Sequence, residues 1–207
     1  MLYREAGDYS TSYPEDSQTF PIKFDRYRYY VILAVAFLVI PFFINDYWAN
    51  AVLVPFLIYS IAAIGLNILT GYCGQVSLGT GGFMAVGAYA CYKLMTSFPE
   101  ISIMIHILLA GGVTAAVVTL FGLPSLRIKG FYLAVSTLAA QFFLVWMFNK
   151  VPWFYNYSMT GMIGSPERTV LGIVVTGPAT DAWAKYMICL IFVTLCAVLA
   201  RNMTRGS

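Results

Sequence analysis

Six long stretches of this 207-residue chain contain no Asp, Glu, Lys or Arg and are largely apolar. They cover residues 29 to 44, 51 to 69, 76 to 92, 101 to 122, 131 to 148 and 186 to 200. A helix needs about 20 mostly apolar residues to cross the roughly 30 Å hydrocarbon layer of a bilayer. A lipid-facing strand would instead alternate apolar and polar residues, which these stretches do not do. We therefore predict an all-α integral membrane protein, a polytopic bundle of about six transmembrane helices.

The composition also indicates that lipid, rather than water, surrounds most of the chain. Hydrophobic residues make up 60% of it and charged residues 10%, whereas soluble domains average about 45 to 50% and about 25%. The net charge of +3 is small and its basic residues are scattered, which excludes a nucleic-acid partner. The four cysteines are not spaced as CxxC pairs, and there is one histidine. We therefore expect no metal site and expect the cysteines to be small core residues.

The charged residues suggest an orientation in the membrane. Residues 1–25 are polar and poor in aliphatic side chains, which predicts a disordered cytoplasmic tail before a membrane domain at 26–207. Lys and Arg are enriched in cytoplasmic loops, and a cytoplasmic N-terminus agrees with most of the basic residues near span ends. It places Lys23, Arg26, Arg28, Arg127, Lys129, Arg201 and Arg205 inside, and Lys93, Lys150, Arg168 and Lys185 outside.

The connection from 149 to 183 is long for a compact bundle. Its aromatic residues, such as Trp153 and Trp183, predict an aromatic belt at the outer membrane surface. A connection of this length with little apolar periodicity is often functional. The alternative interpretation is therefore a docking surface.

Glycine is concentrated between residues 67 and 89, which read NILTGYCGQVSLGTGGFMAVGAY and include Gly71, Gly74, Gly79, Gly81 and Gly82. Glycine permits local unwinding and close approach of backbones, and the polar side chains nearby need a partner or water at membrane depth. For 71–80 this pattern favours a discontinuous helix that faces a solute path, because irregular backbone in a membrane survives only within protein or along a cavity. The alternative is tight packing through small residues, the simpler interpretation for Gly81, Ala85 and Ala88.

A second unusual stretch begins near residue 124. Arg127 and Lys129 predict a short cytoplasmic loop that either anchors the topology or contacts a cytoplasmic partner. Polar residues then interrupt the next apolar span. We predict that five polar residues within or at the ends of uncharged spans hydrogen-bond a small polar solute, namely Gln75, Ser77, Thr80, Ser136 and Gln141.

These two stretches resemble the inner-membrane permease subunits of branched-chain amino acid ABC importers. The resemblance rests on IAAIGLNILTGYCGQVSLGTGGFMAVGAYA at 61–90 and LPSLRIKGFYLAVSTLAAQ at 123–141, with a weaker match in YNYSMTGMIGSPE at 155–167. It implies a multi-pass protein of the bacterial inner membrane that pairs with a second, homologous permease. It also implies two cytoplasmic ATPase subunits and a periplasmic solute-binding protein.

The resemblance implies that ATP is used by the partner subunits and that this chain needs no cofactor. The chain has no GxxxxGK[ST] phosphate-binding loop, and the expected function is therefore a non-enzymatic permease. Family members continue beyond the region that corresponds to 201–207, which implies that the C-terminal part is missing from this sequence.

Other functions remain open from the sequence. An ion-coupled secondary transporter would normally carry an acidic residue within the membrane, and the predicted spans contain none. A permease for urea or short amides would use the same architecture. A scaffold would use the glycine-rich segment for helix packing alone. The sequence has no paired intramembrane carboxylates that would support an intramembrane enzyme.

Overall fold

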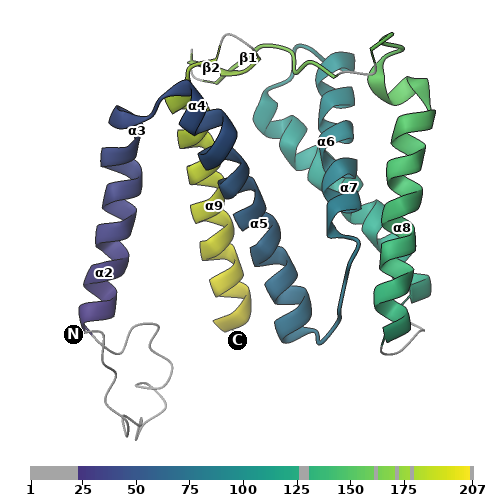
Figure 1. Ribbon diagram of the computed structural model, residues 1–207, viewed down its shortest axis with the longest axis horizontal. Coiled ribbons are helices and arrows are strands. Elements are labelled where there is room, and N and C mark those ends of the chain that lie inside the picture. Colours follow the sequence, from purple (N-terminus) through teal and green to yellow (C-terminus); the bar gives the residue numbers. More distant parts are fainter. Residues whose placement is uncertain (1–22, 126–130, 161–162, 171–172, 178–179, 206–207) are drawn as a thin grey trace, which may run out of the picture. The chain divides into compact units, whose positions relative to one another are not determined.

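The computed structural model describes residues 23–125, 131–160, 163–170, 173–177 and 180–205, and these residues are largely helical (Figure 1). The chain divides into one unit that ends at Ile44 and a second that begins at Asn45. In the first unit α2 (Lys23–Ala34), a π-helical turn (Val35–Val39) and α3 (Ile40–Phe43) follow one another without a break. The predicted tail lies almost entirely outside the described residues, and the domain boundary at 26 stays a prediction.

The second unit begins with a long, continuous helical stretch. It comprises α4 (Asp46–Trp48), a π-helical turn (Ala49–Leu53), α5 (Val54–Asn67) and a further π-helical turn (Ile68–Tyr72). Proline lacks the N–H that an α-helix needs and crowds the preceding turn. One π-helical turn precedes Pro41 and another precedes Pro55, so the wider turns accommodate the prolines without ending the helix.

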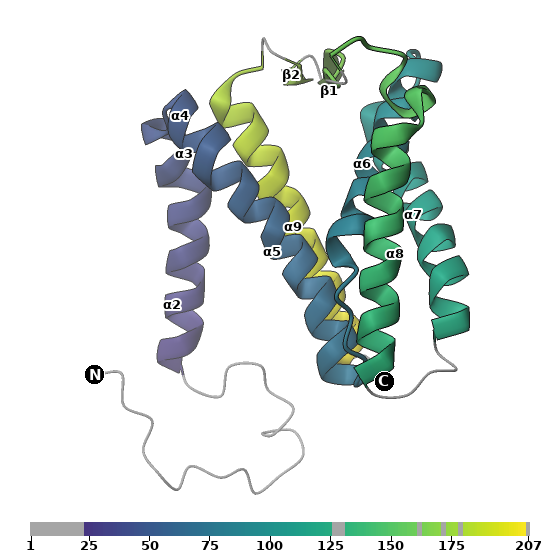
Figure 2. The same ribbon diagram turned by 45° about the vertical axis from the view of Figure 1, so that its right-hand side comes forward.

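The remaining elements of the second unit are α6 (Thr80–Ser97), α7 (Ile103–Ser125), α8 (Phe131–Lys150), a 3₁₀ turn (Pro152–Tyr155), β1 (Arg168–Val170), β2 (Ile173–Thr176) and α9 (Ala182–Arg205). Helices α5, α7 and α9 run in one direction, and α6 and α8 run in the opposite direction (Figures 1 and 2). Helix α5 packs along α9, while α6 packs against both α7 and α8. Strands β1 and β2 pair antiparallel.

The prediction of a polytopic helical membrane protein is confirmed. Within the described residues, five helical stretches are long and apolar enough to span a membrane, namely Arg26–Phe43, Asp46–Tyr72, Ile103–Leu123, Tyr132–Lys150 and Ala182–Thr204. Each corresponds to a predicted span and differs from it by a few residues at either end. The sixth predicted span, 76–92, forms α6, which is long enough but is not among these five. Its start is corrected to Thr80, because residues 76–79 are not helical.

One buried cluster of the second unit is rich in aromatic rings. Leu144 and Phe148 of α8 and Val86 of α6 form its centre. Tyr89 stacks on Phe148 with 4.3 Å between ring centroids, and Phe154 meets both rings edge-on. Elsewhere large apolar side chains face outward, as Leu108 and Leu120 do with 76% and 70% of their surfaces exposed. Such surfaces are stable in lipid or against another protein and not in water.

The connection between α8 and α9 is tied to the C-terminal end of α6. Asn156 accepts a hydrogen bond from the Lys93 ammonium and donates one to the Tyr92 hydroxyl (2.9 Å). The same ammonium lies 4.2 Å from the centre of the Trp153 ring, a cation–π contact. Arg168 donates to the carbonyls of Met95 (2.6 Å) and Pro99 (2.7 Å). Part of the connection at 149–183, for which a docking surface was the alternative interpretation, thus packs against α6 of the same chain.

Candidate functional site

The glycine-rich segment is non-helical between α5 and α6. Residues 73–79 have no helical structure, and the chain rises through them from the end of α5 to the start of α6 (Figure 1). Gly74 has a φ of +64°, a left-handed conformation that glycine adopts without strain. Just beyond it, the N–H of Gln75 bonds to the Leu69 carbonyl at 3.1 Å, which closes the last turn of the preceding helix. The predicted discontinuity is therefore present, and it lies at 73–79.

Two glycines bring the start of α6 into close contact with α8. A Cβ atom on Gly79 would lie 2.6 Å from the backbone carbonyl oxygen of Thr137. A Cβ atom on Gly82 would lie 2.9 Å from the Cα of Gln141. The Leu78 N–H also donates to the Thr137 hydroxyl at 3.0 Å, which joins the non-helical segment to α8. A side chain at Gly79 or Gly82 would therefore collide with the α8 backbone, whereas at Gly81, for which tight packing was the simpler interpretation, a Cβ would lie at an ordinary 3.4 Å from the Gln141 side chain.

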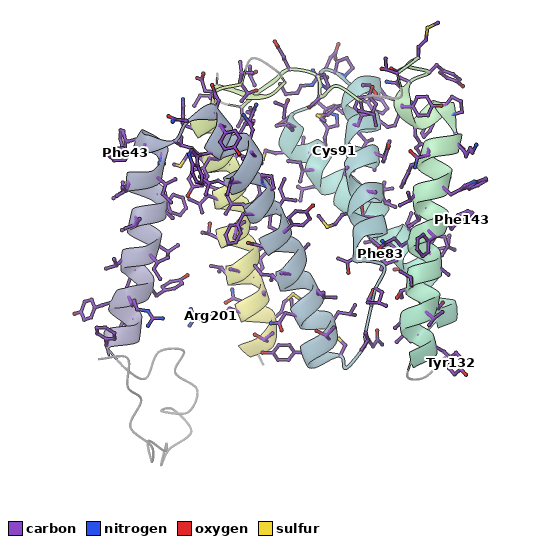
Figure 3. The ribbon with its side chains drawn as sticks, viewed as in Figure 1. Phe43, Phe83, Cys91, Tyr132, Phe143 and Arg201 are labelled. Carbon is purple, nitrogen blue, oxygen red and sulfur yellow. The ribbon has the colours of Figure 1, made fainter. Side chains whose placement is uncertain are left out.

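A cavity of about 910 Å³ lies beside this junction. Its walls come from α5, α6, α7 and α8 and from the non-helical segment. Four of the five predicted solute-binding residues line it, namely Gln75, Ser77, Thr80 and Ser136. Phe83 and Cys91, both on α6, also line it, and Figure 3 marks their positions. The sequence therefore identified polar residues that the fold brings together around one space.

The polar groups of this cavity differ in how fully they are bonded. Thr114 and Thr119 donate their hydroxyls to carbonyls of their own helix. In the part of the chain that the structure describes, the side chains of Gln75, Thr80 and Ser136 make no hydrogen bond. The rest of the lining is mostly apolar, with aliphatic residues from α5 and α7. The cavity therefore combines apolar walls with a few polar groups that are available to a ligand.

The start of α6 has unpaired backbone donors, and of these residues Thr80 lines the cavity, whereas Gly81 and Gly82 do not. The first intrahelical bond joins the Phe83 N–H to the Gly79 carbonyl at 3.2 Å, and no side chain caps the helix. Among the described residues, the N–H groups of Thr80, Gly81 and Gly82 find no acceptor. Unpaired N–H groups at a helix N-terminus attract negative charge.

The other predicted residues lie elsewhere. Gln141 is not among the cavity-lining residues, because its side chain packs over Gly81 and Gly82. Gly71 has only the Asn67 side chain within 4 Å of a Cβ built on it. Arg127 and Lys129 lie outside the described residues, so their predicted cytoplasmic loop stays a prediction. Within the described ranges, no group of three or more His, Cys, Asp or Glu residues could hold a metal ion.

Helix α7 contributes a wall that the sequence did not reveal as part of the site. Gly111, Thr114, Thr119 and Gly122 line the cavity from this helix. Space remains open above Gly111 and Gly122, since no atom lies within 4 Å of a Cβ built on either residue. In the sequence, the repeated glycines and threonines within this apolar span could have indicated that α7 lines a site, because a purely lipid-facing helix would carry mostly aliphatic side chains.

Comparison with known proteins agrees with this architecture. Residues 49–207 match the model of a family described as "Branched-chain amino acid transport system / permease component". Two curated proteins, each described as "High-affinity branched-chain amino acid transport system permease protein LivM", are similar to part of the chain. The protein from Salmonella typhimurium is 43% identical and that from Escherichia coli is 40% identical, each over 82 residues.

These 82 residues make up 40% of this chain and 19% of each relative, so the match spans about a fifth of the relatives' length. No solved structure matches the chain.

Proposed function

Because this chain belongs to the family of permease components of branched-chain amino acid transport systems, we propose that it forms the membrane path of an ATP-driven amino acid importer. The solute is a branched-chain or other small amino acid. The chain is a permease and not an enzyme, and ATP is bound and hydrolysed by two cytoplasmic partner subunits. A second, homologous permease and a periplasmic solute-binding protein complete the complex in the bacterial inner membrane, with the N-terminus of this chain in the cytoplasm.

The observation that carries this proposal is the cavity lined by Gln75, Ser77, Thr80 and Ser136. A branched-chain amino acid joins an aliphatic side chain to an ammonium and a carboxylate. The apolar walls match the aliphatic part, and the unbonded polar groups match the charged part. Thr80, the first residue of α6, lines the cavity, and a helix N-terminus favours negative charge, which supports a carboxylate there.

The non-helical segment suggests how the path changes access. Residues 73–79 join two helices without helical structure of their own and border the cavity through Gln75 and Ser77. Discontinuous helices at a solute site are a recurrent feature of transporters that expose the site alternately to each side. In this proposal ATP hydrolysis on the partners changes which side of the cavity is open, and this chain breaks no covalent bond.

The first test is uptake by the assembled complex. The chain, as part of its intact permease, is reconstituted in proteoliposomes with the partner permease and the ATPase subunits, and binding protein is added outside. We expect uptake of branched-chain amino acids that requires both ATP and binding protein. Uptake that survives ATP depletion and collapses with an ion gradient would contradict the proposal, and selective uptake of urea would correct the solute.

The second test compares two serines. We expect Ser136→Leu to lower uptake by about tenfold or more, because it removes a hydroxyl and adds bulk within the cavity. Ser60→Leu is the matched control, since Ser60 lies on α5 outside the cavity and donates its hydroxyl to the Phe56 carbonyl. Equal uptake by the two variants, at equal amounts of folded complex, would remove Ser136 from the path.

A further inference from the structure

A second cavity of about 750 Å³ lies beneath the paired strands β1 and β2. Val170 and Val175 line it from the strands, Ile58 from α5, Met104 from α7 and Cys189 from α9. Its volume lies in the range of about 300 to 1,000 Å³ that is usual for small-molecule sites. This space is large enough to hold a small amino acid together with water.

Ile107 is the structural link between the two cavities. Among the described residues that line them, Ile107 alone borders both. On α7 the second cavity extends from Ile103 to Ile107, and the first extends from Ile107 to Leu123. At 1.5 Å per residue these stretches measure about 6 Å and about 24 Å along the helix. Together the cavities follow nearly the whole length of α7, with one aliphatic side chain where they meet.

We propose that the cavity beneath the strands is an outer chamber of the solute path and that the Ile107 side chain is the barrier between this chamber and the inner cavity. This inference rests on the proposed function for the identity of the solute. The position of Ile107 between the two spaces follows from the residues that line each cavity and does not depend on the solute.

The chemistry of the outer chamber agrees with an amino acid as its occupant. Its walls are mainly Val, Ile and Met side chains, which match an aliphatic group. Lys185 supplies a cation whose ammonium lies 3.3 Å from the side-chain oxygen of Asn50, and no carboxylate among the described residues pairs with it. A carboxylate that enters the chamber therefore meets a positive charge, while the aliphatic part of the solute meets apolar walls.

Two native cysteines report on the two spaces separately. Cys91 lines the inner cavity, and Cys189 lines the outer chamber. Neither residue takes part in a disulfide. Single-cysteine versions of the intact permease, each with its other cysteines changed to serine, can be expressed with the partner subunits. A positively charged, membrane-impermeant methanethiosulfonate reagent is then added to the outside of spheroplasts.

We expect the reagent to modify Cys189 and to leave Cys91 largely unmodified. Ile107→Ala should accelerate the modification of Cys91 by about tenfold or more, because it removes the bulk of the barrier. Ile107→Val should give a smaller increase and guards against misfolding of the alanine variant. Leu108→Ala is the matched control, since Leu108 is the next residue on α7, is 76% exposed and lines neither cavity. It should leave both rates unchanged.

Equal Cys91 rates in the Ile107→Ala and Leu108→Ala variants would overturn the proposal. So would a Cys91 that reacts as fast as Cys189 while Ile107 is intact. The labelling needs no transport, so its failure is separate from failure of the proposed function. Labelling that depends on Ile107, in a complex without ATP-dependent amino acid uptake, would support the barrier and remove the amino acid as its solute.

Discussion

Gly79, the residue immediately before α6, lies against the backbone of α8. A Cβ atom there would lie 2.6 Å from the Thr137 carbonyl oxygen, and backbone cannot move aside as a side chain can. We expect Gly79→Ala to push the two helices apart and to lower the free energy of unfolding by about 1 to 3 kcal/mol, the usual cost of overpacking. The measurement is the thermal unfolding midpoint of the purified permease in detergent.

Gly112→Ala is the control for this substitution. Gly112 lies within α7 and has no atom within 4 Å of a Cβ built on it. The added methyl group therefore enters open space, and alanine favours helix over glycine by about 1 kcal/mol. A Gly112→Ala variant as unstable as Gly79→Ala would show that close packing against Thr137 is not the cause.

Thr137 gives a second prediction at the scale of one residue. Its hydroxyl donates to the Ala134 carbonyl (2.9 Å) and accepts the Leu78 N–H (3.0 Å). Thr137→Val keeps the shape of the side chain and leaves that N–H without its acceptor, which costs about 1 to 3 kcal/mol where water is excluded. We expect faster amide hydrogen exchange at 77–79, measured by mass spectrometry.

Thr119→Val provides the comparison, because the Thr119 hydroxyl donates only within its own helix, to the Ala115 carbonyl. Exchange at 77–79 should be unchanged in this variant. If Thr137→Val also left that exchange unchanged, the link between the non-helical segment and α8 would not depend on the hydroxyl.

For single residues, the sequence indicated which polar side chains were candidates for the solute path, and it did not indicate where each side chain lies in the fold. Gln75, Ser77, Thr80 and Ser136 were recognisable because a polar side chain in an uncharged span needs a partner. Gln141 met the same criterion and nevertheless packs over the glycines of α6. Its position depends on the register between α6 and α8, which no pattern within either helix specifies.

Among the elements, the paired strands are joined to the end of α6 by the Arg168 side chain. Arg168 of β1 donates to the carbonyls of Met95 and Pro99 at the C-terminal end of α6. A cation is favoured at that end by the helix dipole and by the unpaired carbonyls. We expect Arg168→Ala to loosen the strands from the end of α6, although they also contact α7 and α9, with faster hydrogen exchange across β1 and β2 and little change in α8.

Arg168→Lys tests whether geometry or charge holds this contact. A lysine keeps the charge and cannot donate in the planar geometry of a guanidinium. We therefore expect exchange rates between those of the natural chain and Arg168→Ala. Unchanged exchange in the alanine variant would mean that the strands are held by other contacts.

The elements also differ in how far the sequence predicted them. Five spans were predictable to within a few residues because apolar length follows directly from the thickness of the bilayer. The strands β1 and β2 were not predicted, since they are only 3 and 4 residues long and lie in a connection with little apolar periodicity. The apolar run at 76–92 placed the start of α6 too early, and it was the glycines of 71–80 that indicated the break in this region.

For the whole molecule, the number of crossings depends on α6. This helix has 18 residues, about 27 Å at 1.5 Å per residue, which is close to the roughly 30 Å of hydrocarbon. Its glycines, its tyrosines and Lys93 make it less apolar than a typical span. Helices α5 and α7 nevertheless run in the same direction, which requires the chain to return across the layer between them (Figure 2).

We therefore expect the two ends of α6 to lie on opposite sides of the membrane. Cys73 is exposed just before α6, and Glu100 follows it. With the N-terminus in the cytoplasm, Cys73 should react with an impermeant thiol reagent only in inside-out vesicles. Glu100→Cys, in a chain without the native cysteines, should react only from outside, and Asn45→Cys should match it because α5 separates Asn45 from Cys73. If Cys73 and Glu100→Cys reacted from the same side, α6 would not cross, and neither cavity could be part of a path through the membrane.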